Sequence, residues 1–400
     1  MRNLTIIFYL SILSFDIYSQ STDTLKVVTQ NSADKLLTSD GKLLLGGYGE
    51  VHYNQPLNAG IKNNGTLDVH RMVLLLGYNF SQNTQFISEI EFEHVSEVYV
   101  EQAFLQYRFK PFLNLRAGLM LIPMGIINEY HEPVTFNGVE RPESDTRIVP
   151  TTWREIGVGI TGILVPVSLK YQFYVVTGFN GYDGEARLNG RNGFRGARQR
   201  GAESYVITPN ITGKIEYYGL KGLNIGLSGY FGKSQSTLYE GIDKDNRTAI
   251  LKADSSVTGI AMAGLDARYS STGLQLRGQI YYTAISNTDQ YNKFTGKEGL
   301  SNDLGSAMLG YYLEAGYDIL RFIPDSDKEL ILFGRYEKSN THFSTIDSEI
   351  NGSYNNDIIT CGLTLKLAKG AVVKGDMQFI KSPDSPELNK VFNAGFGIMF

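Results

Sequence analysis

Basic side chains recur at alternate positions within short segments that are otherwise rich in aliphatic and aromatic residues. In an extended backbone every second side chain points to the same side. The cations that share one face in this way are Arg71, Arg108, Arg116, Lys170, Lys214, Arg268, Arg277, Arg335, Lys366 and Lys374. Fixed positive charges that line a water-filled passage lower the barrier for anions. These residues therefore predict binding and guidance of anions.

Acidic side chains occupy the same faces and leave a second interpretation open. They are Glu50, Glu89, Glu91, Glu93, Glu216, Asp266, Glu314, Asp318 and Asp376. Burying an ionised group without a partner is costly, so a face that carries so many charges must be wet or paired. We expect most of these charges to form ordinary cross-strand pairs and a minority to act on ions.

Two long segments between the alternating ones carry charge of opposite sign. Residues 122–153 contain an acidic majority, namely Glu129, Glu132, Glu140, Glu143 and Asp145 against Arg141 and Arg147. Residues 181–203 contain Arg187, Arg191, Arg195, Arg198 and Arg200. The planar fork of arginine matches phosphate and carboxylate groups. The second segment therefore predicts either an anion funnel or a binding site for the phosphates of lipopolysaccharide.

Other kinds of chemistry find little support. The five histidines, at positions 52, 70, 94, 131 and 342, lie on different segments without metal-ligand spacing, and no serine nucleophile motif is present. Asp243 begins a run like that of a calcium loop but lacks the later glycine and glutamate. The single cysteine, Cys361, has no partner for an internal disulfide. A net charge of −4 does not resemble that of a nucleic-acid binder. We expect no enzyme, metal site, cofactor or nucleic-acid partner.

The elements that must position these charges are strands. Apolar and polar residues alternate in sixteen segments of about ten residues, the length with which a tilted strand crosses a bilayer. The segments are 43–53, 66–80, 84–94, 99–109, 112–121, 154–163, 167–179, 204–218, 222–232, 257–269, 273–284, 307–320, 328–338, 357–367, 370–380 and 390–400. Short and long connections alternate strictly between them. This pattern predicts an all-β protein, a transmembrane antiparallel β-barrel of about 16 strands with short periplasmic turns and long extracellular loops.

The outward faces distinguish a membrane barrel from a secreted soluble β-protein. Leu113, Leu115, Ala117, Leu119 and Leu121 alternate with Asn114 and Arg116, so one whole face of that strand is apolar. An apolar exterior with a polar interior inverts the soluble pattern and suits a bilayer.

Both ends of the chain suggest export to the cell outer membrane. Arg2 followed by a mostly apolar stretch predicts a signal peptide over residues 1–19, cleaved near Ser19. A polar periplasmic leader over residues 20–41 would then precede a barrel over residues 42–400. The last strand alternates apolar residues as far as Phe400, which resembles the signal read by the barrel assembly machinery.

A family resemblance rests mainly on residues 119–181. Its residues are Gly118-Leu119, Pro123-Met124-Gly125, Glu129, Glu132, Phe136, Glu140-Arg141, Arg154-Glu155-Ile156-Gly157-Val158 and Thr177-Gly178-Phe179-Asn180-Gly181. Together with the strand layout they resemble the phosphate-selective porin O and P family in its Bacteroidota form. The resemblance implies a sixteen-stranded, trimeric outer-membrane porin whose inward-folded loops narrow the pore and select anions. The loop over residues 122–153 joins strands five and six, where many porins place the constriction loop.

Two functions remain open. The first is passive diffusion of small hydrophilic solutes, with anions such as phosphate favoured by the resemblance although the loop over residues 122–153 is acidic. The second is a structural or adhesion barrel at the cell surface, in contact with lipid and lipopolysaccharide, whose lumen is plugged. The two functions differ in conductance.

Overall fold

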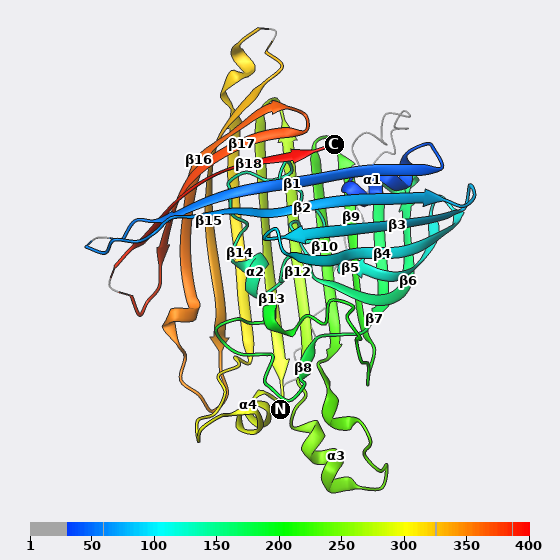
Figure 1. Cartoon of the computed structure of the whole chain (residues 1–400), viewed down its shortest axis with the longest axis vertical. Coiled ribbons are helices and arrows are strands. Elements are labelled where there is room, and N and C mark those ends of the chain that lie inside the picture. The colour runs from blue at the N-terminus through cyan, green and yellow to red at the C-terminus, as the bar shows by residue number, and fades with distance from the viewer. Residues whose placement is uncertain (1–29, 59, 325, 386) are drawn as a thin grey trace, which may run out of the picture.

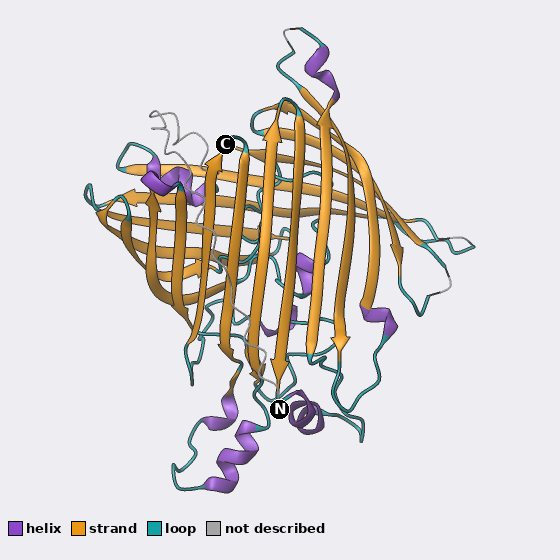
Figure 2. Cartoon of the chain, turned by 180° about the vertical axis from the view of Figure 1, so that it is seen from behind, coloured by secondary structure: helices purple, strands orange, loops and turns teal. Residues whose placement is uncertain are grey.

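The computed structural model describes residues 30–58, 60–324, 326–385 and 387–400. The expected signal peptide, residues 1–19, and the leader as far as residue 29 lie outside the described residues. Within the described part, sixteen antiparallel strands close into one barrel (Figures 1 and 2). The prediction of a sixteen-stranded antiparallel barrel is confirmed.

The barrel strands follow one another around the wall in chain order. Their bounds are β1 Leu43–Pro56, β2 Thr66–Asn79, β3 Thr84–Glu93, β4 Glu97–Lys110, β5 Leu113–Leu121, β6 Arg154–Leu164, β7 Leu169–Val176, β9 Asn210–Leu220, β10 Leu223–Lys233, β12 Gly259–Ser271, β13 Leu274–Ser286, β14 Ala307–Asp318, β15 Glu329–Ser344, β16 Asn355–Ala368, β17 Ala371–Lys381 and β18 Asn389–Met399. Two short strands, β8 Asn180–Tyr182 and β11 Gln235–Ser236, pair with each other outside the wall. Each of the sixteen predicted segments thus corresponds to one wall strand.

Some strand bounds differ from the sequence prediction for local reasons. β9 begins at Asn210 instead of residue 204, directly after Pro209, which has no N–H for the ladder. β7 begins at Leu169 because Ser168 adopts a left-handed backbone with a φ of 53°. β15 is longer than expected and continues to Ser344.

β1 and β18 close the barrel. Gly47 and Phe400 exchange two backbone hydrogen bonds, with N···O distances of 3.1 and 2.9 Å. A Cβ atom at Gly47 would lie 2.7 Å from both the Phe400 ring and the Val73 carbonyl oxygen. Only glycine allows the strands to approach this closely at the seam.

The connections at the two ends of the barrel differ in length. At one end the strands are joined mostly by tight turns, such as residues 111–112, 221–222 and 369–370. At the other end lie the long loops, which carry α3 (Arg247–Asp254) and α4 (Thr288–Thr295), as the lower part of Figure 1 shows. We call these ends the turn end and the loop end; in an outer-membrane barrel they face the periplasm and the exterior, respectively.

The outer face of the wall is apolar. On β2 the outward residues Met72, Leu74 and Leu76 are 49%, 44% and 36% exposed, whereas Val73 and Leu75 point inward and are buried. Because the sixteen wall strands form a closed barrel, the wall has no free strand edge. Its backbone N–H and C=O groups are therefore paired where the wall lies in the hydrocarbon of a bilayer. No helix among the described residues is long and apolar enough to cross a membrane.

Two segments occupy the interior of the barrel. The long loop between β5 and β6, residues 122–153, lies largely buried inside and carries the short helix α2 (Ser144–Arg147). The helix α1 (Ser32–Thr38) lies near the turn end, on the opposite side from α3 and α4 (Figure 1). Its N-cap is Asn31, whose side chain accepts a hydrogen bond from the Asp34 N–H at 2.8 Å.

Candidate functional site: a loop inside the lumen and two cavities

Apolar packing holds the loop over residues 122–153 against the wall formed by β1 to β5. The inward side chains of that wall include Tyr48, Val73, Ile87 and Phe104, all at most 1% exposed. They belong to one buried cluster that also contains Ile122, Met124, Ile148, Val149 and Trp153 from the loop and Ala33, Leu36 and Leu37 from α1. An apolar core therefore fills part of the lumen.

Hydrogen bonds to the loop backbone hold its other side. The carboxylates of Glu337 and Asp376 each accept a hydrogen bond from a loop N–H, those of Ser144 and Val139, at 2.7 Å. Arg335 donates to the Glu140 carbonyl at 3.1 Å. A buried backbone that is not in regular secondary structure must find such partners elsewhere. Many charges predicted to face water in the lumen therefore bind this loop.

Ion pairs neutralise most of the predicted lumen cations. The pairs are Arg71–Glu50, Lys170–Asp34, Lys214–Glu129, Arg268–Glu216, Arg277–Glu314, Arg335–Glu314 and Lys366–Glu329, with N···O distances between 2.5 and 3.5 Å. This arrangement fits the interpretation of ordinary pairing that we expected for the majority. Lys374 differs, because its ammonium lies over the Phe136 ring, 3.7 Å from the centroid.

The carboxylates of the loop over residues 122–153 also have partners. Glu140 lies 3.2 Å from His52 Nδ1, Glu143 pairs with Arg147 at 2.7 Å, and Glu132 accepts the Ser32 N–H at 2.6 Å. Asp145 accepts hydrogen bonds from Gln279 and Tyr281. The acidic side chains of this loop are therefore held by contacts within the protein and do not simply face open solvent.

A buried cluster pins the middle of the loop to β1, β3 and β4. The Tyr48 hydroxyl donates to Glu89 at 2.7 Å and lies 2.8 Å from His131 Nε2, while His131 is 3.5 Å from Glu101. Glu101 is the extra residue where the register between β3 and β4 shifts, a bulge that turns both it and Gln102 inward.

A cavity of about 190 Å³ lies between the inserted loop and the loop end. We call it the loop-side cavity. Its charged lining consists of Arg71, Arg141, Arg154, Arg195, Arg198 and Arg200 against Glu91, Glu93 and Glu140. The cations outnumber the carboxylates by two to one, so the lining of this cavity carries a net positive formal charge.

Three of those arginines come from the arginine-rich loop and form no ion pair with a carboxylate among the described residues. Arg198 donates to the carbonyl of Thr151 and to the hydroxyl of Thr152, and Arg200 lies over the ring of Tyr99, 5.1 Å from its centroid. Burial and the neighbouring Arg200, Arg195 and Arg154 lower the pKa of Arg198 to about 9. Its guanidinium stays charged at neutral pH, and an anion beside it would relieve this repulsion.

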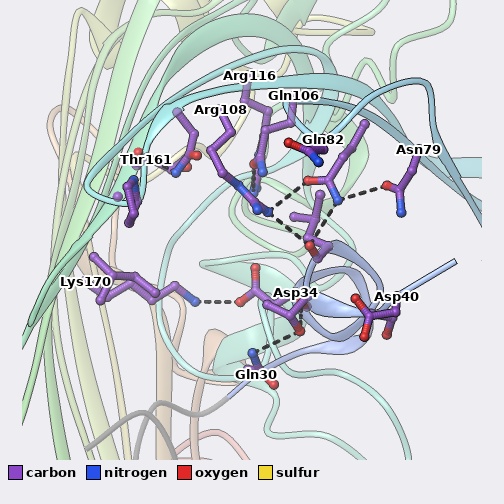
Figure 3. Close-up of a pocket in the computed structure, with 18 of the residues that line it drawn as sticks. Gln30, Asp34, Asp40, Asn79, Gln82, Gln106, Arg108, Arg116, Thr161 and Lys170 are labelled. Carbon is purple, nitrogen blue, oxygen red and sulfur yellow. Dashed lines mark hydrogen bonds and ion pairs between the residues drawn. The ribbon is translucent and has the colours of Figure 1, made fainter. Parts of the chain in front are cut away.

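A larger cavity of about 780 Å³ opens toward the turn end, and Figure 3 shows its lining. We call it the turn-side cavity. Arg108 bonds to the Leu37 carbonyl and to Gln85, while Arg116 bonds to Gln106 and Tyr174. Neither arginine has a carboxylate partner in the described part of the chain. The lining residues of the two cavities do not overlap.

The remaining predicted site residues lie elsewhere. Arg187 pairs with Asp183 at 2.8 Å in a neighbouring pocket, and Arg191 is exposed and does not line the loop-side cavity. Arg200, which we named with the arginine-rich segment of the sequence, lines the loop-side cavity, whereas Arg154 also lines it but was not among the candidate cations. Arg154 is the first residue of β6, where alternation alone does not indicate which way its side chain points.

Comparisons with known proteins support this architecture. The chain has the fold of the anion-selective porin from Comamonas acidovorans, with a TM-score of 0.56 and 13% identity over 90% of this chain and 100% of that one. Salmonella typhi OmpF in complex with daunomycin gives a TM-score of 0.56 at 12% identity, covering 90% and 97% of the two chains. Pseudomonas putida OprB at high pH gives a TM-score of 0.53 at 10% identity, over 90% of this chain and 94% of that one.

The closed barrel, its apolar exterior and these shared folds define the class: the chain is a multi-pass outer-membrane β-barrel with a porin-type fold. No model of a known protein family matches the sequence. A protein of Aquifex aeolicus (strain VF5), described only as uncharacterized, is 33% identical over 326 residues, which cover 78% of this chain and 70% of that protein. The chain belongs to the same family as this Aquifex protein.

Proposed function

We propose that the protein is a passive outer-membrane channel for small hydrophilic solutes with a preference for anions, phosphate among them. The observation that carries the proposal is the distribution of unpaired cations. Arg108 and Arg116 in the turn-side cavity, and Arg195, Arg198 and Arg200 at the loop-side cavity, have no carboxylate partner among the described residues. Most other lumen cations are neutralised.

Electrostatics explains why this distribution favours anions. Unpaired arginines on both sides of the inserted loop would attract an anion into the loop-side cavity and again into the turn-side cavity. Guanidinium groups also suit the geometry of phosphate and carboxylate oxygens. The anion-selective porin from Comamonas acidovorans shares the fold, and the sequence resemblance to phosphate-selective porins points the same way, although a shared fold is only an analogy for function.

Several expected partners belong to the same proposal. They are a homotrimeric assembly, contact of the outer loops with lipopolysaccharide, and insertion by the barrel assembly machinery. The apolar outer wall is a surface that lipid or a neighbouring copy could cover. Native mass measurement of the detergent-extracted protein tests the trimer directly.

A plugged barrel with a structural role at the cell surface is the second candidate, and one observation favours it. A buried layer that includes Tyr48, Phe104 and His131 belongs to neither cavity lining, and the two linings share no residue. For a channel, solutes would have to pass beside the loop over residues 122–153, which would then act as the constriction. For a plug, that loop would seal the lumen.

Conductance separates the two candidates. We expect the purified protein to form discrete channels in planar bilayers, with a reversal potential in a KCl gradient that indicates chloride preference. Absence of channels from correctly folded, heat-modifiable protein would support the plugged barrel. Channels that prefer potassium would leave the porin fold intact and contradict the anion preference.

The selectivity test replaces the three unpaired arginines of the loop-side cavity. The variant Arg195→Gln, Arg198→Gln, Arg200→Gln should lose most of the anion preference in about 0.1 M salt and show a smaller change in about 1 M salt, since the screening length falls from about 10 to about 3 Å. Arg191→Gln is the matched control from the same loop, because it removes a charge outside the cavity lining. Equal shifts in the two variants would show that the cavity has no special role.

A further inference from the structure

Three of the five histidines meet near the loop end, although they come from separate segments. His52 on β1 stacks on His70 of β2 with a centroid distance of 4.6 Å, and His70 makes an edge contact of 5.5 Å with His94, which follows β3. Asp68 lies among them. Its carboxylate and one nitrogen from each of His70 and His94 lie within 4.8 Å of one another.

A β-bulge turns His70 toward this group. The register between β1 and β2 shifts by one residue between Glu50 and Val51, so that Glu50 pairs with Arg71 and Val51 with Val69. His70 is the extra residue. Consecutive residues in a regular strand point to opposite faces, yet His70 and Arg71 both line the loop-side cavity. Bulges of this kind redirect side chains at functional sites.

The backbone at His94 is also unusual. His94 and Val95 both have a left-handed backbone, with φ values of 52° and 68°. For residues with a side chain this conformation costs about 1 kcal/mol or more and persists where the surroundings impose it. It brings His94 Nδ1 to 2.6 Å from Asp68 Oδ2, while His70 Nδ1 lies 3.6 Å from the same oxygen.

We propose that Asp68, His70 and His94 bind a divalent transition-metal ion, of which Zn²⁺ is the representative. Two imidazole nitrogens and one carboxylate oxygen form a donor set suited to Zn²⁺, Ni²⁺ or Cu²⁺. Ligands at about 2.0–2.1 Å from a tetrahedral ion are about 3.3 Å apart. The two measured separations from the Asp68 oxygen lie on either side of that value, and all three ligand atoms lie within 4.8 Å of one another, so side-chain adjustments on the order of 1 Å would bring them to these distances.

The site is accessible and has room for water as a further ligand. The side chains of Asp68, His70 and His94 are 25%, 28% and 46% exposed, so an ion could reach them from the loop end. Because His70 also lines the loop-side cavity, a bound dication would stand beside its arginines. It would add positive charge at the entrance, and we expect it to strengthen the anion preference of an open channel.

A second group of possible ligands must be distinguished from this one. Glu89, Glu101 and His131 satisfy the same distance condition but are buried in the cluster that pins the inserted loop. His131 Nε2 there lies 2.8 Å from the Tyr48 hydroxyl, and both of its neighbouring carboxylates accept from that hydroxyl. The buried group is closed to solvent and already engages the Tyr48 hydroxyl, whereas the exposed group is open to solvent, which makes the exposed group the better metal site.

Metal binding can be measured without reference to conductance. Full-length protein carrying no polyhistidine tag, in detergent and free of lipopolysaccharide, is titrated with Zn²⁺ by calorimetry. Cu²⁺ electron paramagnetic resonance then identifies nitrogen ligands. We expect one ion per chain, and at least tenfold weaker binding in the variant His70→Gln, His94→Gln. Heat-modifiable gel mobility shows that each variant is folded.

Two control variants make the result specific. His52→Gln removes the stacked histidine, which is not one of the proposed ligands. His131→Gln removes the histidine of the buried group. Both variants should bind Zn²⁺ with an affinity within about threefold of that of the parent. Absence of binding in the parent at millimolar Zn²⁺, or loss of binding in His131→Gln but not in the double variant, would overturn the proposal. Zn²⁺ binding by calorimetry does not depend on whether the protein conducts ions, so this test still holds if the channel proposal fails.

Discussion

The two halves of the lumen wall hold the inserted loop with apolar and polar contacts in different proportions. The wall of β1 to β5, which we call the apolar wall, presents Tyr48, Val73, Ile87 and Phe104 to a buried cluster shared with the loop, and adds polar contacts such as that of the Tyr48 hydroxyl with His131. The wall of β12 to β17 presents Gln279, Glu314, Arg335, Glu337 and Asp376, and contacts the loop mainly through hydrogen bonds to its backbone and polar side chains.

The difference shows how an irregular segment of 32 residues can be buried inside a barrel. Apolar burial supplies most of the favourable free energy, at about 25 cal/mol per Å² of apolar surface, but it has little directional preference. Hydrogen bonds contribute less net free energy, yet each unmet buried N–H or C=O would be costly. The apolar cluster therefore supplies most of the affinity for the loop, and the hydrogen bonds from the wall fix the positions of the loop residues that they contact.

The largest effect should come from the apolar wall. Phe104→Ala removes a side chain that is 1% exposed and packs in the cluster with Trp153. We expect a loss of about 3–5 kcal/mol in the free energy of unfolding, because the cavity left behind closes only in part. Urea unfolding followed by the fluorescence of Trp153, the single tryptophan, measures it. Phe109→Ala, on the outward face of the same strand, should cost much less; equal losses would show that the inner cluster is not tightly packed.

An intermediate effect should come from a buried acidic residue of the loop that the polar wall holds. Asp145 is buried and accepts from Gln279 and from the Tyr281 hydroxyl at 2.8 Å. Asp145→Ala leaves both donors without this acceptor, and we expect a loss of about 1–3 kcal/mol together with noisier single-channel currents. Asp145→Asn keeps an acceptor oxygen and should lie between the parent and the alanine variant. If alanine equals the parent in both measurements, the polar wall does not position the loop.

The smallest effect should come from a conservative change in the same wall. Glu337→Gln keeps the oxygen that accepts the Ser144 N–H and removes only the negative charge. We expect a change within about 0.5 kcal/mol, typical of a substitution that breaks none of the main stabilising features. A loss comparable to that of Asp145→Ala would mean that the charge of Glu337, rather than its geometry, holds the loop.

The sequence is sufficient to predict the strands of the barrel wall, but it does not predict how the residues inside the lumen are paired and packed. Alternation with a period of two, and the regular change between short and long connections, predict sixteen strands and their order. Which lumen charges pair depends on contacts between distant segments, such as Arg335 with the Glu140 carbonyl, and these have no local signature. Leu121, expected on the outward face of its strand, is only 7% exposed at the end of β5, directly before the inserted loop.

The histidine group shows the same limit. Its ligands come from β2 and the turn after β3, so spacing along the chain gives no indication of a metal site. Its geometry also depends on the bulge at His70 and on the left-handed backbone of His94. Neither feature can be recognised from the alternation of apolar and polar residues. Strict alternation across residues 68–71 would place Asp68 and His70 on the opposite face from Arg71. The observed bulge brings His70 and Arg71 to the same cavity.

The position of the loop over residues 122–153 also sets an order of events during folding. Its contacts come from strands on opposite sides of the wall, from Tyr48 on β1 to Asp376 on β17, and they exist together only after β1 has paired with β18. The loop can therefore complete its contacts only when the wall has closed, so its full ordering should coincide with or follow the appearance of the heat-resistant barrel.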